Sequence, residues 1–259
     1  MLPVLFKIPY FGWPIHSYGF MLAVAFLLAI IGLGREGKKY NIGYENIIDL
    51  ATWVLIGAIV GARLAYIITE YRYFLSSPWW EVFKVNSGGL AFHGGLIGGF
   101  LAGYGYTRYK RISTWKLADL VAPYIALGYS IVRIGCFLNG CCYGKISNVA
   151  WALRCEANDV ALRHPTQLYS MLGSFILFLI LRRLRNHKQF DGFLFLLYIG
   201  LYSIMRFIVE IFRESPMVTP WLSLAQLVCV ILGMLAFGLI GFFEWRVNTK
   251  LRSKSSNSI

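Results

Sequence analysis

The sequence predicts an all-α integral membrane protein, built as a bundle of seven transmembrane helices. Of its 259 residues, 58% are hydrophobic and only 14% are charged. A soluble domain carries roughly 25% charged residues, and a soluble fold of this size cannot bury so much apolar surface. The 17% aromatic content also fits a membrane protein, because Trp and Tyr collect at lipid–water interfaces. The same composition excludes disordered chains, collagen-like repeats and small disulfide scaffolds.

Seven stretches reach the length of about 20 mostly apolar residues that a bilayer-spanning helix needs. They are 16–34, 47–68, 90–107, 117–138, 167–184, 191–211 and 221–243. The first stretch lacks a strongly basic start and a clear small-residue cleavage site, so we interpret it as a retained helix and not a signal peptide. We expect residues 1–245 to form a single seven-helix domain and residues 246–259 a basic cytoplasmic tail.

The Lys and Arg residues predict the orientation in the membrane, because cytoplasmic connections carry an excess of them. Fifteen of the 25 lie in the first, third and fifth connections and in the tail, and only seven lie on the other side. The N-terminus is therefore expected outside and the C-terminus in the cytoplasm. The topology explains the net charge of +13, so no nucleic acid partner is expected.

Charged or polar groups stand near one end of six of these stretches. In chain order, Tyr18 opens the first, Arg63 lies near the end of the second, His93 opens the third, Arg133 lies near the end of the fourth, His164 and Gln167 open the fifth, and Arg206 and Glu210 lie near the end of the sixth. In the predicted topology all of these ends face outward. A charged group in hydrocarbon is costly and by default marks a functional site.

Two interpretations of these groups compete. A single arginine near a helix end can simply extend its side chain to water. Several arginines with one acidic partner, Glu210, instead leave surplus positive charge, and guanidinium groups bind phosphate through pairs of hydrogen bonds. The set as a whole favours a membrane cavity for a phospholipid head group, open toward the outer leaflet.

Tyr202, Arg206 and Glu210 are spaced by four residues and share one face of a helix. They either form a simple ion pair with a neighbouring aromatic side chain, or Glu210 orients Arg206 toward a phosphate while Tyr202 lends a hydroxyl. His93 precedes two glycines, and such a helix start exposes N–H groups that can hold an anion. His93 is either a hydrogen-bonded structural histidine or a group that takes a proton from a nucleophile.

Four of the five cysteines gather at or just beyond the end of the fourth stretch: Cys136, Cys141, Cys142 and Cys155. One disulfide is compatible with the outer side, for example between Cys142 and Cys155, but sequence alone does not give the connectivity. The spacing C-x₄-C-C is not usual for zinc ligands, so no metal is expected. Cys229, alone in the last stretch, is interpreted as a packing residue.

Three segments carry a family resemblance: GGLAFHGGLIGG at 88–99, RIGCFLNGCCYG at 133–144 and HPTQLY at 164–169. Supporting matches are Tyr18-Gly19, Gly61 to Leu64, Asp119 before Ala122-Pro123, and Tyr202 with Arg206 and Glu210. By these residues the chain resembles prolipoprotein diacylglyceryl transferase, a family of bacterial membrane enzymes. The resemblance covers nearly the whole chain in the right order.

The second segment departs from the family signature, which reads Gly-Arg-x-Gly-Asn-Phe-x-Asn-x-Glu-x-x-Gly with Ala allowed at its fourth position. Val132 stands for the first Gly, Cys136 for Asn and Cys141 for Glu. In the third segment Ser170 follows where the family usually has Glu. These departures leave open a divergent branch with the same reaction, or a paralogue with another acceptor or lipid.

The resemblance implies transfer of the diacylglyceryl group of phosphatidylglycerol to the lipobox cysteine thiol in the signal peptide of a prolipoprotein. The product is a thioether, glycerol phosphate leaves, and no cofactor is implied. The expected place is the bacterial cytoplasmic membrane, with the site toward the extracytoplasmic side.

The hypothesis assigns a role to each candidate residue. Arg133 and Arg206 hold the phosphate, and Glu210 orients Arg206. His93 takes the thiol proton, with Tyr202 as the competing candidate. Tyr18, Asn139 and Gly144 shape the head-group pocket together with Gln167, while Arg63 either helps to bind or braces the bundle.

Two other classes of function compete. A transporter would place ionisable groups near the midplane and often contains internal repeats, and neither feature is found in the sequence. A paralogue that binds phospholipid without chemistry would keep Arg133 and Arg206, and the substitutions at Cys136 and Cys141 are compatible with it.

Overall fold

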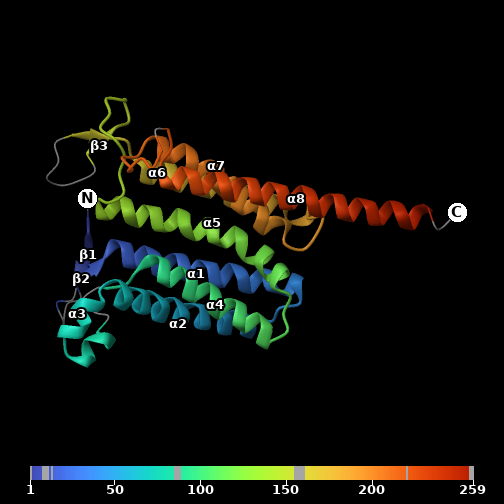
Figure 1. The fold of residues 1–259 in the computed structure, drawn as a ribbon, viewed down its shortest axis with the longest axis horizontal. Helices are drawn as coiled ribbons and strands as arrows, with labels where there is room; N and C mark the ends of the chain where they lie inside the picture. Colours follow the sequence, from blue (N-terminus) through green and yellow to red (C-terminus); the bar gives the residue numbers. More distant parts are fainter. Residues whose placement is uncertain are drawn as a thin grey trace. The chain divides into compact units, whose positions relative to one another are not determined.

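The computed structural model describes residues 2–7, 12, 14–84, 89–154, 161–219 and 221–256, and it is almost entirely helical (Figure 1). The α-helices are α1 (Ser17–Gly37), α2 (Tyr44–Thr69), α3 (Tyr71–Ser76), α4 (Phe92–Tyr109), α5 (Thr114–Asn139), α6 (Thr166–Leu184), α7 (Phe193–Ile211) and α8 (Leu224–Ser256). Short 3₁₀ helices are η1 (Lys38–Tyr40), η2 (Trp79–Phe83) and η3 (Arg185–His187). Two antiparallel hairpins pair β1 (Val4–Lys7) with β2 (Pro14–His16) and β3 (Leu153–Arg154) with β4 (Leu162–Arg163).

Six helices are long and apolar enough to cross a membrane, which confirms an integral membrane protein of helical class. They contain the segments Ser17–Tyr40, Tyr44–Thr69, Thr114–Asn139, Thr166–His187, Phe193–Ile211 and Leu224–Thr249. The third predicted stretch, 90–107, does form helix α4, but this helix is not one of the six. Six of its 18 residues are glycines, which contribute little hydropathy. Helix α8 also continues well past the predicted end at residue 243.

The chain divides into two compact units. The first comprises residues 1–32 and 118–259, and the second comprises residues 33–117. Helices α1 and α5 each begin in one unit and end in the other.

In the second unit α2 and α4 pack backbone against backbone, because glycines replace side chains where they meet. A methyl group added at Gly61 would lie 2.8 Å from the Cα of Gly98, and one at Gly57 would lie 2.7 Å from the Gly98 carbonyl oxygen. Small residues of this kind let helices in a membrane approach closely. The glycines that follow His93 on α4 therefore serve this helix contact.

In the first unit α6, α7 and α8 run side by side (Figure 1). The start of α7 is capped from α5. Asp119, which is fully buried, accepts hydrogen bonds from the backbone N–H groups of Gly192 at 2.9 Å and Phe195 at 3.2 Å. These donors have no partner inside their own helix, so a carboxylate there stabilises the start of α7.

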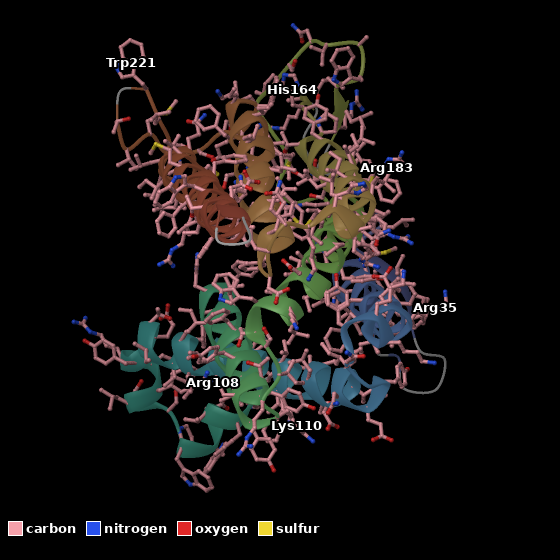
Figure 2. The ribbon with its side chains drawn as sticks, turned by 90° about the vertical axis from the view of Figure 1, so that its right-hand side faces the viewer. Arg35, Arg108, Lys110, His164, Arg183 and Trp221 are labelled. Carbon is pink, nitrogen blue, oxygen red and sulfur yellow. The ribbon has the colours of Figure 1, made fainter. Side chains whose placement is uncertain are left out.

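The hairpin of β3 and β4 lies beyond the start of α6, on the side away from the C-terminus (Figure 1). The loop between α7 and α8 carries Trp221, whose side chain is 85% exposed and projects away from the helices (Figure 2). The end of α5, the start of α6 and the end of α7 meet at this end of the unit. It is the end to which the sequence assigned most of the candidate residues.

Candidate functional site

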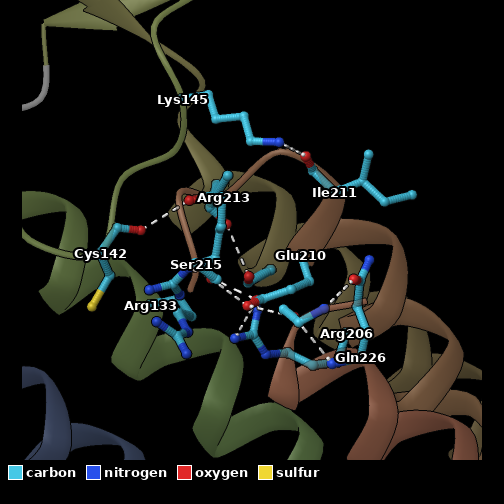
Figure 3. Close-up of polar contacts among 12 residues, drawn as sticks. Arg133, Cys142, Lys145, Arg206, Glu210, Ile211, Arg213, Ser215 and Gln226 are labelled. Atoms are coloured by element: carbon cyan, nitrogen blue, oxygen red, sulfur yellow. Dashed lines mark hydrogen bonds and ion pairs between the residues drawn. The ribbon is translucent and has the colours of Figure 1, made fainter. Parts of the chain in front are cut away.

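A loop of six residues after α5 holds three helix ends together. The backbone N–H of Gly144 donates to the carbonyl of His164 at 2.9 Å, before α6, and that of Lys145 donates to Phe212 at 2.8 Å, after α7. The Lys145 ammonium also donates to the carbonyl of Ile211 at 3.0 Å (Figure 3). The polar side chains at these helix ends thus surround one fixed loop.

Gly144 and Gln167 fix this loop from inside. A methyl group at Gly144 would lie 2.8 Å from Cγ2 of Thr166, so no larger residue fits. The Gln167 amide, fully buried, donates from Nε2 to the carbonyl of Cys141 at 2.7 Å, and the Thr166 hydroxyl donates to the carbonyl of Cys142 at 2.9 Å. Both predicted substrate-binding residues therefore position the loop.

Arg206 and Glu210 form the central ion pair of the site (Figure 3). Arg206 Nη2 lies 2.6 Å from Glu210 Oε2. The angles at this oxygen do not suit a hydrogen bond, so the contact is mainly an electrostatic attraction between the two charges. Arg206 Nη1 is buried without a hydrogen-bond partner. The other oxygen of Glu210 accepts hydrogen bonds from the hydroxyl groups of Ser215 and Ser223.

Positive charge exceeds negative charge here. Arg213 Nε lies 4.0 Å from the same Glu210 oxygen, so one carboxylate faces two guanidinium groups. Arg133, on α5, has no carboxylate within ion-pair distance in the described part of the chain, and its Nε is buried without a hydrogen-bond partner. Donors left unpaired in this way are available to an anionic ligand.

Arg133 is held by an aromatic side chain one turn earlier on α5. Its Nη2 donates to the Tyr129 hydroxyl at 2.5 Å, and its guanidinium carbon lies 4.5 Å from the centre of the Tyr129 ring. The Tyr129 ring meets that of Tyr202 edge to face at 5.5 Å, and Tyr202 also packs on Tyr198. Tyr129 thereby links Arg133 on α5 to Tyr202 on α7.

The thiols of Cys136, Cys141 and Cys142 converge beside Arg133. Their sulfur atoms all lie within 4.8 Å of one another, and Arg133 Nη1 lies 3.9 Å from the sulfur of Cys136. All three are free thiols. Cys155, the partner considered for Cys142 from the sequence, lies outside the described residues. Cys229 is buried within α8, as expected for a packing residue.

The electrostatic surroundings of the two loop thiols differ. The pKa of the Cys142 thiol is lowered to about 5, chiefly because its thiolate accepts a hydrogen bond from Cys136. A hydrogen bond from Cys141 and the positive charges of Arg133 and Arg213 lower this pKa further. Together these effects outweigh burial, which acts to raise it. Burial instead raises the pKa of the Cys141 thiol. Of these two thiols, Cys142 is the one that the site stabilises as a thiolate.

Tyr18 and Asn139 border the thiol cluster. Tyr18, in the first turn of α1, interacts electrostatically with Cys136 and Arg133 and is 40% exposed. Asn139, the last residue of α5, is exposed and forms a side-chain hydrogen bond with Cys141.

The remaining two candidates, Arg63 and His93, lie in the second unit. Arg63 is buried, and its guanidinium donates to the carbonyl oxygens of Glu81, Val82 and Gly89 at 2.5, 2.8 and 3.0 Å. These bonds fasten the loop between α2 and α4, which favours the bracing alternative. His93 lies in the first turn of α4, is exposed, and contacts the ring of Phe92.

Sequence reasoning did not select Tyr129 or Arg213. Tyr129 precedes Arg133 by four residues and Arg213 follows Glu210 by three, so helical spacing was the signal that could have found both. Arg213 counted only as a loop charge in the sequence.

An apolar groove of about 390 Å³ runs between α6 and α7 next to the same helix ends. Gly173, Leu177, Met205 and Ile208 line it, and Phe212 and Tyr169 close its end near the loop. Its wall is almost entirely hydrocarbon, which suits an acyl chain better than a polar ligand.

Comparison with known proteins identifies relatives along nearly the whole chain. The family model described as "Prolipoprotein diacylglyceryl transferase" matches residues 3–242. Three relatives bear the name phosphatidylglycerol–prolipoprotein diacylglyceryl transferase. The protein from Campylobacter hominis is 37% identical, with 97% of this chain and 94% of that protein covered. The protein from Clostridium tetani is 36% identical, with 83% of this chain and 87% of that protein covered. The protein from Clostridioides difficile is 33% identical, with 96% of this chain and 96% of that protein covered.

Proposed function

Because the chain belongs to the prolipoprotein diacylglyceryl transferase family, we propose that it transfers the diacylglyceryl group of phosphatidylglycerol to the lipobox cysteine thiol of prolipoprotein signal peptides. The thiol sulfur forms a bond to the glycerol carbon, the bond from that carbon to the phosphate oxygen breaks, and glycerol phosphate leaves. One observation carries the proposal: Arg133 and Arg206 both present buried N–H donors without partners at one end of the first unit.

The arginines account for the chemistry of the leaving group. Arg133 and Arg206 bind the phosphate of phosphatidylglycerol, and positive charge there stabilises the negative charge that develops as the carbon–oxygen bond breaks. Glu210 orients Arg206 through their ion pair. The apolar groove between α6 and α7 offers room for an acyl chain next to the same helix ends.

The nucleophile is the thiol of the incoming signal peptide. It reacts as the thiolate, which nearby arginines favour and which a base must generate. His93 is the proposed base, acting directly or through water, with Tyr202 as the competing candidate. Tyr18 and Asn139 border the head-group pocket, Gly144 and Gln167 position its loop, and Arg63 braces the second unit.

The enzyme is proposed to sit in the bacterial cytoplasmic membrane with the site on the extracytoplasmic side. Helix α4 is the proposed seventh transmembrane helix, and residues 1–245 are treated as one domain with a basic tail at 246–259. The distribution of Lys and Arg residues supports an outer N-terminus and a cytoplasmic C-terminus. Signal peptides, phosphatidylglycerol and membrane lipid are the proposed partners, and no nucleic acid is involved.

The second candidate function is a paralogue that binds phospholipid without this chemistry or uses another acceptor. Cys136 and Cys141 favour it, because the family signature has Asn and Glu there. These substitutions remove an amide and a carboxylate but leave Arg133, Arg206 and Glu210 in place.

Reconstitution of the full chain with phosphatidylglycerol and a lipobox peptide tests the proposal. We expect the peptide to gain the mass of a diacylglyceryl group. Arg133→Ala should abolish the transfer while the protein still inserts, and Arg183→Ala, an exposed arginine at the other end of α6 (Figure 2), should leave it unchanged.

Two other outcomes would change the proposed function or the role of Arg133. Near-normal transfer by Arg133→Ala would remove Arg133 from the mechanism. Phosphatidylglycerol binding without transfer by the unaltered protein would support the paralogue.

A further inference from the structure

We propose that Cys136, Cys141 and Cys142 form a three-sulfur binding site for a soft monovalent metal ion, Cu⁺. The family signature has Asn and Glu at the positions of Cys136 and Cys141, so the three-sulfur site does not follow from the proposed lipid chemistry. Binding would release the proton of each thiol that is still protonated and leave a copper ion held by three thiolates, with no change in the oxidation state of the metal.

The distances suit three sulfur ligands around one ion. The three sulfur atoms already lie within 4.8 Å of one another. With metal–sulfur bonds of about 2.3 Å, a planar three-sulfur site needs sulfur–sulfur distances of about 4 Å. Each side chain therefore needs to move by less than about 1 Å, which rotation about the bonds to the sulfur supplies.

The backbone holds the three thiols in this arrangement. Cys136 lies in the last turn of α5, and the Cys141 N–H donates to its carbonyl at 3.1 Å. Cys142 has φ of 64°, a left-handed conformation uncommon for a residue with a side chain. Side chains at the start of α6 fix the carbonyl oxygens of Cys141 and Cys142. The ligands are thus organised before any ion arrives.

The surrounding charge compensates the thiolates. Three thiolates and one Cu⁺ carry two net negative charges. Arg133 Nη1 lies 3.9 Å from the Cys136 sulfur, and the positive charges of Arg133 and Arg213 both act on Cys142. Without these arginines three thiolates this close together would repel one another strongly.

The ligand set favours Cu⁺ over other ions. Among the described residues no His, Asp or Glu completes the group, which is made of sulfur alone. Soft thiolate ligands select Cu⁺ and Zn²⁺ over hard cations. Structural Zn²⁺ sites almost always take four protein ligands, whereas three sulfurs are supplied here. Cys136 is buried, and the other two thiols are half-buried, which leaves an entry path.

The test is a Cu⁺ titration of the reduced, full-length protein in detergent without oxygen, in competition with a chromogenic Cu⁺ chelator. We expect one Cu⁺ per chain. Cys136→Ser should weaken binding by more than about 100-fold, the upper range of what loss of a supporting residue costs at a metal site. Cys229→Ser is the matched control, because it removes a buried thiol in α8 outside the cluster. This variant should bind Cu⁺ as tightly as the unaltered protein does.

X-ray absorption at the copper edge gives a readout that does not depend on affinity. Three sulfur neighbours at about 2.3 Å are expected. The same spectrum is expected from Cys155→Ser, and loss of a sulfur in that variant would overturn a three-sulfur site made of the named thiols. Elution of Cys136→Ser at the volume of the unaltered protein in gel filtration shows that its loss of binding is not unfolding.

Three results would overturn the proposal. One is a protein with all thiols reduced that binds no Cu⁺. Another is a Cu⁺ affinity in Cys136→Ser, Cys141→Ser and Cys142→Ser that equals the affinity of the unaltered protein. The third is Zn²⁺ displacing Cu⁺ at equal concentration, which would leave a sulfur site but overturn its assignment to copper.

Discussion

Arg206 Nη2 lies 2.6 Å from Glu210 Oε2, one turn further along α7, while Arg206 Nη1 is buried without a hydrogen-bond partner. One side of the guanidinium is thus fixed by the protein, and the other is left for a ligand. A buried arginine with an unused donor is costly in an apolar environment. An anionic head group bound there would remove that cost.

Glu210→Gln should reduce both activity and stability. The neutral amide leaves the Arg206 charge buried without its partner, which costs about 3 kcal/mol of unfolding free energy. A misplaced Arg206 should slow lipid transfer by about 100-fold. Arg213→Gln is the control, because Arg213 lies 4.0 Å from the same oxygen and should cost much less. Equal losses in the two variants, measured by transfer rate and thermal unfolding in detergent, would contradict a special role for Arg206.

Tyr129→Phe tests how Arg133 is held. It keeps the ring against the guanidinium but removes the hydroxyl that accepts the 2.5 Å hydrogen bond. Loss of a hydrogen bond to a charged group costs about 1.5 kcal/mol, so the transfer rate should fall about tenfold. Tyr198→Phe alters a hydroxyl on α7 that does not bind Arg133 and should have little effect. If the two variants had the same rate, Tyr129 would not position Arg133.

His93→Gln tests the identity of the base. If His93 takes the thiol proton, the variant should transfer lipid at least about 100-fold more slowly, and its rate should depend differently on pH. His93→Asn is a second variant with an amide, carried on a shorter side chain, that cannot act as a base. Tyr202→Phe distinguishes the competing base. An unchanged pH profile in both His93 variants would count against His93.

Asp119→Ala should destabilise the first unit without touching the chemistry. The carboxylate accepts two N–H bonds at the start of α7, and loss of such a cap costs about 2 kcal/mol. Asp191→Ala removes a half-exposed carboxylate that pairs with Lys188 and should cost less than about 1 kcal/mol. Thermal unfolding gives the comparison. A lower transfer rate per folded molecule of Asp119→Ala would show that the cap also shapes the site.

Gly61→Leu should separate α2 from α4. Even a methyl group there would lie 2.8 Å from the Gly98 Cα, and overpacking of this kind costs about 3 kcal/mol. Gly105→Leu is the matched control on α4, since nothing lies within 4 Å of a methyl group at that position. Accessibility of single cysteines placed on α2 and α4 reports the separation. Equal unfolding temperatures would show that the glycine contact is not tight in the membrane.

The sequence predicted the helices well because membrane helices carry two redundant signals, apolar length and charged ends. Arg206 and Glu210 could be paired from their spacing alone, since four residues return a helix to the same face. Helix α4 was also predicted, although its glycines lower its hydropathy below that of the other long helices.

Contacts between distant segments could not be predicted in the same way. Nothing local shows that Gln167 holds the carbonyl of Cys141, or that Arg63 binds the carbonyls of the loop before α4. In the sequence, an arginine within an apolar stretch looks the same whether its partner in the fold is a phosphate or a backbone carbonyl. Only the fold distinguishes Arg63, whose donors are used by the protein, from Arg133.

Helix α8 has a practical consequence for work with this protein. It spans the 33 residues Leu224–Ser256, which is about 13 residues more than a bilayer-spanning helix needs. A fluorescent reporter fused directly after Ser256 would therefore stand on a helical stem of about 20 Å. Its tumbling should be restricted, so polarised emission from such a fusion would follow the tilt of α8 in living cells.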